Sequence, residues 1–126
     1  MARTALTPVT LTANTTTADP AGTALDATNS HVFTASSPLD EYVIRVVNTT
    51  NATKALTVKA GDNPPADAAG QGDLSVSLTD GSGTPQVKWV GPLASARFIQ
   101  NDGTVNLDVA SGMTGTITVF RIPRNA

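Results

Sequence analysis

The sequence is poor in the residues from which most active sites are built. It contains no cysteine, so disulfide bridges and thiolate chemistry contribute neither to its fold nor to its function. The one histidine, His31, cannot form a metal site that needs several histidines. We expect His31 to lie at the surface or at a strand edge, and the alternative is a lone general base whose partner the sequence does not identify.

Basic charge and long apolar runs are also missing. The net charge of the 126 residues is −2, and no cluster of lysine or arginine is concealed within that total. A phosphate-backbone binder needs the opposite sign, so we expect no direct nucleic-acid partner. No apolar run is long enough to span a bilayer, and the N-terminus does not resemble a signal peptide, so we expect no membrane association.

Aromatic residues are scarce, and alternating aliphatic residues take their place. The chain has three phenylalanines, one tryptophan and one tyrosine, so valine, leucine and isoleucine must supply most of a narrow core. Apolar and polar residues alternate with the period of a half-buried strand. The segments that show this alternation are 42–47, 55–59, 74–78, 87–90, 105–109 and 116–122.

Loop signals separate these segments. Residues 60–73 contain two adjacent prolines and three glycines, which predicts a surface loop. Asn101, Asp102 and Gly103 predict a hairpin between "ARFIQ" and "VNLDV", because glycine readily adopts positive φ. The predicted fold is all-β: a single-domain β-sandwich with long loops, for which jelly-roll topology is one alternative.

The N-terminal third departs from this pattern. Residues 1–28 are predicted to form an extended arm, or an edge strand followed by a loop, and residues 29–126 to form the sandwich domain. Pro8 restricts a strand over residues 6–12 to a sheet edge, with Val9 and Leu11 pointing the same way. An arm that becomes ordered on a partner is the alternative to a long loop.

Acidic residues and aromatics provide the remaining candidates. Asp62, Asp67 and Asp73 bracket the predicted loop, where they could ligate calcium or simply be solvated, although the spacing is not that of an EF-hand. We expect no cofactor, no metal site and no catalytic residues. The core anchors are predicted to be the largest residues on alternating strands, namely Tyr42, Ile44, Trp89 and Phe98.

Three stretches resemble the small capsid decoration, or cement, proteins of tailed bacteriophages, particularly those that infect actinobacteria. They are "ARTALTPVTLTANTTTADPAGTALDATNSHVF", "VKAGDNPPADAAGQGDLSVSL" and "KWVGPLASARFIQNDGTVNLDVASGMTGTITVFRIPR". The resemblance implies a structural, non-enzymatic protein that is made in the host cytoplasm and located on the outer surface of the capsid. The implied partner is the major capsid protein, whose lattice the decoration protein stabilises.

The resemblance also suggests how the chain would associate. A homotrimer is favoured, with a monomer as the alternative, and self-association would cover a second apolar face containing Val43 and Val47. The candidate capsid-binding residues lie in the N-terminal segment, which could add an edge strand to a neighbour; they are Thr4, Leu6, Val9 and Leu11. The competing functions are another phage structural β-domain, from a tail or head fibre, and a carbohydrate-binding module.

Overall fold

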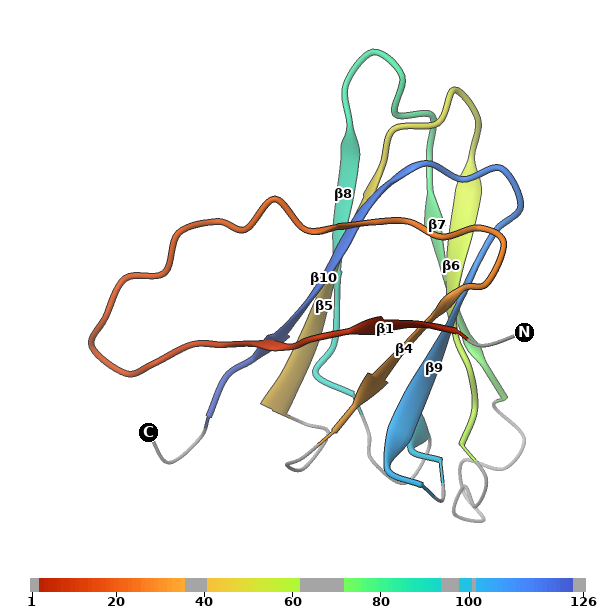
Figure 1. The fold of residues 1–126 in the computed structure, drawn as a ribbon. Coiled ribbons are helices and arrows are strands. Elements are labelled where there is room, and N and C mark those ends of the chain that lie inside the picture. Colours follow the sequence, from red (N-terminus) through yellow and green to blue (C-terminus); the bar gives the residue numbers. More distant parts are fainter. Residues whose placement is uncertain (1–2, 36–40, 62–71, 94–97, 101, 124–126) are drawn as a thin grey trace.

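The computed structural model describes residues 3–35, 41–61, 72–93, 98–100 and 102–123. The strands in these residues form two sheets that pack against each other (Figure 1), which confirms the predicted all-β sandwich. The strands are β1 (Thr4–Leu6), β2 (Val9–Thr10), β3 (Thr23–Ala24), β4 (His31–Thr34), β5 (Tyr42–Asn48), β6 (Lys54–Val58), β7 (Leu74–Leu78), β8 (Gln86–Val90), β9 (Thr104–Val109) and β10 (Gly115–Arg121).

The two sheets have different strand orders. Sheet A has the order β1-β4-β9-β6-β7, and sheet B has the order β2-β10-β5-β8, with β3 also paired to β10. The chain passes from one sheet to the other at every connection except two: β2 and β3 both belong to sheet B, and β6 and β7 are neighbours in sheet A. Jelly-roll topology stays a prediction.

Buried residues alternate with less buried ones along the strands, and the buried ones form the inner faces of the two sheets. In β9, Val105, Leu107 and Val109 are buried while the residues between them are half-buried. In β5, Tyr42 and Ile44 point into the core in the same way. Period-two burial follows from the pleat of a strand, which sends successive side chains to opposite faces.

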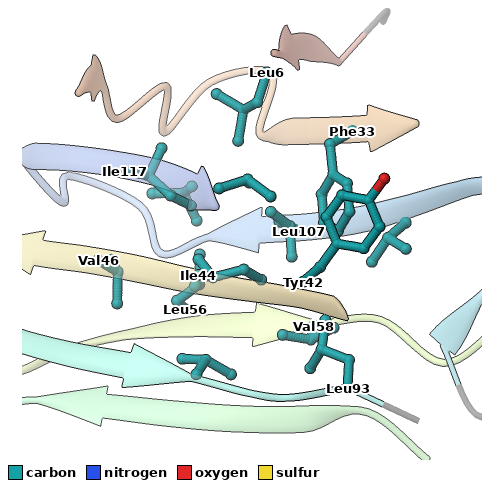
Figure 2. Packing of buried hydrophobic residues seen from close by; sticks show 14 of the residues in the cluster. Leu6, Phe33, Tyr42, Ile44, Val46, Leu56, Val58, Leu93, Leu107 and Ile117 are labelled. Carbon is teal, nitrogen blue, oxygen red and sulfur yellow. The ribbon is translucent and has the colours of Figure 1, made fainter. Parts of the chain in front are cut away.

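The core lies between the two sheets, where side chains of both inner faces meet (Figure 2). Phe33 of β4 and Tyr42 of β5 place their rings 5.4 Å apart, centroid to centroid, at 39°. Three of the predicted anchors, Tyr42, Ile44 and Phe98, are at most 3% exposed. The core therefore depends on a few aromatic contacts surrounded by aliphatic residues.

The prediction that Trp89 anchors the core was wrong, because Trp89 is 60% exposed. β8 contains Val87, Trp89 and Val90, so either set of alternating positions places an apolar side chain inward. Pairing with β5 decides between them, because Ile44 lies opposite the buried Val90. Once Val90 points inward, the pleat turns Trp89 outward.

The segment between Phe98 and β9 also differs from the predicted hairpin. Residues 94–97 and Asn101 lie outside the described residues, and Phe98–Gln100 form no strand. The turn itself is present, because the backbone N–H of Gln100 donates to the Thr104 carbonyl at 2.8 Å and Gly103 has φ of 83°. Phe98 lies in the core, but it does not belong to a strand as predicted.

The N-terminal segment contributes to both sheets. The strand expected over residues 6–12 is divided at Thr7 and Pro8 into β1, parallel to β4, and β2, parallel to β10. Residues 11–22 then leave the body as a long loop, in red and orange in Figure 1, and return to β3. The first strands are thus edge strands, as the proline predicts.

Candidate interaction surface

The largest exposed hydrophobic side chains of the described residues gather on the outer face of sheet B. Val87 and Trp89 are 41% and 60% exposed, and Ile122 is 48% exposed. Ile122 follows β10 and continues the alternation of Phe120. Val43 of β5 lies beside Phe120 in the register. We call Val43, Val87, Trp89, Phe120 and Ile122 the Trp89 face.

The centre of this face is an aromatic pair. The rings of Trp89 and Phe120 are stacked, with centroids 5.4 Å apart and an interplanar angle of 30°. Their strands lie on either side of β5, so the contact crosses that strand diagonally. Phe120 is only 6% exposed although it points away from the core. The pair holds the indole in place while leaving most of its surface in solvent.

The loop between β2 and β3 covers another part of the outer face. A Cβ placed on Gly22 would lie 2.8 Å from the Thr118 hydroxyl oxygen, so the backbone packs directly on Thr118. That hydroxyl is buried and has no hydrogen-bond partner. Asp19 lies 3.9 Å from the Arg45 guanidinium, also on this face. The outer face of sheet B therefore has one part covered by its own chain and one open part around Trp89.

The free edge of β8 is poorly suited to strand addition. Lys88 lies opposite Val46, whose side chain is in the core, so the lysine points to the inward side of the edge strand. It remains exposed because β8 is the last strand of its sheet. Inward-pointing charges on edge strands discourage pairing with another chain.

A second polar cluster joins the N-terminal strand to the body. His31 is fully buried; its Nδ1 lies 3.2 Å from the Thr4 carbonyl oxygen, and its Nε2 accepts the Asp26 backbone N–H at 3.0 Å. This arrangement fits a neutral imidazole protonated at Nδ1. Burial lowers the pKa of His31, against the opposing effects of the Thr4 carbonyl and the Asp26 charge. His31 has a structural role at the start of β4.

Asp26 organises the turn that precedes β4. It accepts hydrogen bonds from the Thr4 hydroxyl and from the backbone N–H groups of Thr28 and Asn29. These bonds, the one from Thr4 above all, lower the pKa of Asp26 to about 2. The carboxylate is therefore ionised at neutral pH and ties β1 to the turn.

Ion pairs line the outer face of sheet A. Arg3 lies 2.6 Å from Asp108, and Lys59 lies 2.8 Å from Asp73 and 3.8 Å from Asp108. The hydrogen bond from Lys59 to Asp73 raises the pKa of the lysine. These groups are partly exposed and satisfy one another, as expected of a solvated face.

The predicted capsid-binding residues do not form one surface. The prediction that Leu6 lies on a capsid-binding surface was wrong. Leu6 is 6% exposed and belongs to the core, because β1 pairs with β4 and directs this side chain inward. Thr4 is occupied in the Asp26 turn. Val9 lies beside Phe120 in the register and is half-buried, as is Leu11. Val9 and Leu11 therefore lie at the margin of the Trp89 face.

The described residues provide no metal centre. They contain no group of three or more His, Asp or Glu side chains placed to hold a metal ion. Of the calcium candidates, Asp62 and Asp67 lie outside the described residues, and Asp73 binds Lys59 and the backbone N–H of Ala60. No helix in the described part of the chain is long and apolar enough to cross a membrane.

Comparisons of the chain with protein-family models, curated proteins and solved structures found no match.

Part of this face could be predicted from the sequence. The second apolar face was expected through Val43 and Val47, but Val47 is only 8% exposed. The exposed part consists of Val87, Trp89 and Ile122, none of which was predicted to face solvent. The useful signal was Val90, the last apolar residue before Gly91, because its burial sets the orientation of the whole strand.

Proposed function

We propose that this protein binds the outer surface of a tailed-bacteriophage head and stabilises the lattice of its major capsid protein. The observation that carries the proposal is the Trp89 face, on which three large hydrophobic side chains are 41–60% exposed. Contiguous exposed apolar residues mark binding surfaces, and tryptophan is enriched among the residues that dominate binding energy. The resemblance to decoration proteins supplies the class of partner.

Stabilisation of a lattice requires contact area and repetition, and no chemical step. A standard protein interface removes roughly 800 Å² of accessible surface from each partner. A subunit that contacts two capsid proteins links them, because the second contact forms at high effective concentration. A trimer at a local threefold position is the favoured assembly, with a monomer at the centre of a capsomer as the alternative.

Sedimentation with phage heads tests this proposal. Expanded heads assembled without the protein are mixed with it, and bound copies per head are counted. We expect saturable binding at a copy number that matches a symmetry position of the capsid. A Val87→Ser/Trp89→Ser variant should bind at least about tenfold more weakly, since truncating a central aromatic costs about 2 kcal/mol or more.

The matched control is Thr57→Ala/Ser75→Ala, two neighbouring positions on the outer face of sheet A. This control should bind like the unmodified protein. Absence of binding by the folded, unmodified protein would overturn the proposal and favour a tail or head-fibre component. Equal weakening by both variants would exclude the Trp89 face as the contact.

Carbohydrate binding is the second candidate, and the same exposed Trp89 favours it. Sugar-binding β-sandwiches stack a sugar ring on an exposed aromatic, and one part of the indole is free for this role. Titration with bacterial surface polysaccharides should then change the fluorescence of Trp89, the single tryptophan of the chain. An unchanged spectrum, together with head binding, would reject this candidate.

A further inference from the structure

The N-terminal segment is held by parts of the chain that all follow the long loop. β1 pairs with β4 and β2 pairs with β10. The backbone N–H of Thr4 donates to Ser30, and Arg3 pairs with Asp108 of β9. Residues 3–10 thus form a donor segment, and residues 23–123 contain the slot that receives it. Residues 11–22 connect the two.

Residues 23–123 need the donor segment to complete their core and their two sheets. Leu6 fills a place in the core beside Phe33, and Figure 2 shows its side chain entering the cluster from β1. β1 and β2 also pair with the outer edges of β4 and β10. Without the segment, the core would lose a buried leucine and both sheets would expose an unpaired edge.

The connecting loop is much longer than its path requires. β2 ends at Thr10, opposite Arg121, and β3 begins at Thr23, opposite Ile117. These two positions on β10 are four residues apart, which corresponds to roughly 13 Å along a strand. The twelve residues 11–22 can span roughly 40 Å when extended. The excess length forms the loop that leaves the body in Figure 1.

The two ends of the loop are fixed, since the Leu11 N–H donates to the Arg121 carbonyl and Gly22 packs on Thr118, but its middle makes few contacts that would hold it in this path. Residues 12–19 are all exposed. Its turn is held by the Thr15 hydroxyl, which donates to the Thr12 carbonyl, and Asp19 approaches Arg45 no closer than 3.9 Å. Opening this turn exposes no apolar core, since the residues concerned are already in solvent.

We infer that residues 3–10 are exchanged between copies of this chain, so that each copy's β1 and β2 complete the two sheets of a neighbour. Every contact of the segment is reproduced in the neighbour's slot, because donor and slot are joined solely through residues 11–22. Exchange of an identical element is a low-cost route to a closed oligomer. Residues 11–22 are long enough to extend toward a neighbouring copy, and the exchanged segment makes the same contacts there as it makes within one chain.

Introduced cysteines provide a direct test, because the natural chain has none. Ala5 and Val32 are register partners across β1 and β4, and neither is in the core. We would co-express two chains, one with Ala5→Cys and the other with Val32→Cys, and give one of them a tag that increases its mass. The proteins are then purified without phage heads and oxidised. In an exchanged oligomer, the mixed disulfide between the two different chains should be the main product on denaturing gels.

The matched control uses Thr57→Cys and Ser75→Cys chains, which are register partners within the β6–β7 hairpin of the slot. This pair can meet only within one chain, so its mixed disulfide should be at least about tenfold less abundant. Equal yields for the two pairs would overturn the inference. So would a single chain carrying both Ala5→Cys and Val32→Cys that forms its bridge entirely within itself.

A shortened loop gives an independent measurement. Deletion of residues 13–18 leaves six connecting residues, with a reach of roughly 20 Å that still spans the gap within one copy. The apparent mass in light scattering should fall to that of one 12.8 kDa chain, less the deleted residues, and the mixed disulfide should fall to the control level. An unmodified protein that is already monomeric at high concentration would reject exchange, whatever the outcome with phage heads.

Discussion

The outer faces of the two sheets have opposite characters. On sheet A, most outward positions are small or polar, such as Thr57, Ser75 and Asn106, and Lys59 and Asp108 form an ion pair. On sheet B, the outward positions include valines, an aromatic pair and an isoleucine, together with the polar residues Arg45, Thr116 and Thr118. Sheet A therefore has a mainly polar outer surface, whereas the outer face of sheet B is covered in one part by the β2–β3 loop and, among the described residues, stays exposed around Trp89.

The burial patterns of β9 in sheet A and β10 in sheet B differ in the same way. β9 in sheet A alternates regularly between buried and half-buried residues. β10 in sheet B has four consecutive buried residues, Ile117 to Phe120, because Gly22 covers Thr118 and Trp89 covers Phe120. β10 is therefore buried on both sides by residues of its own chain, and the Trp89 region is the part of the outer face that stays exposed.

The largest effect is expected at Phe120. Phe120→Ala should lower the free energy of unfolding by about 3–5 kcal/mol, because it removes a buried ring despite its outward position. Thr57→Ala, at an outward position of sheet A, should change it by less than about 0.5 kcal/mol. Urea unfolding measures both. A Phe120→Ala cost below about 1 kcal/mol would mean that Trp89 does not cover Phe120 in solution.

A smaller effect is expected at Trp89 itself. Because its side chain is 60% exposed, Trp89→Ala removes chiefly the contact with Phe120, which corresponds to about 1 kcal/mol for an aromatic pair. Urea unfolding should show this modest loss while head binding is strongly reduced. A loss of several kcal/mol would instead place Trp89 within a core, and the two outer faces would no longer differ as described.

The smallest effect is a pH dependence at the edge of sheet A. Burial lowers the pKa of His31 in the folded chain, so the unfolded chain binds a proton first as pH falls below about 6.5. Stability is therefore full above that pH and is lost as pH falls toward the folded-state pKa. Between pH 7.5 and 6 the loss is at most about 0.8 kcal/mol.

Urea unfolding at the two pH values measures this loss, with His31→Gln as the control. Glutamine offers a donor and an acceptor but does not titrate, and the chain has no other histidine. The control should therefore show no difference between pH 7.5 and 6, whatever its overall stability. A rise in the stability of the unmodified protein on acidification would contradict a lowered His31 pKa.

Much of the sandwich could be predicted because alternation is a local property. The strands expected at 42–47, 74–78 and 105–109 differ from β5, β7 and β9 by at most one residue at an end. The candidate site was harder to predict. Leu6 was assigned to capsid binding, yet it is buried in the core of the sandwich, since a short apolar strand looks the same whichever sheet edge receives it.

By itself, the sequence determined that the chain is all-β, where most strands lie and that no cysteine contributes to the fold. The tertiary structure decided which side of each strand is inside. β8 illustrates the reason: Val87, Trp89 and Val90 satisfy both orientations locally, and the pairing of Ile44 with Val90 selects one. Strand register is a contact between distant segments, so a shift of one residue exchanges core and surface without changing any local preference.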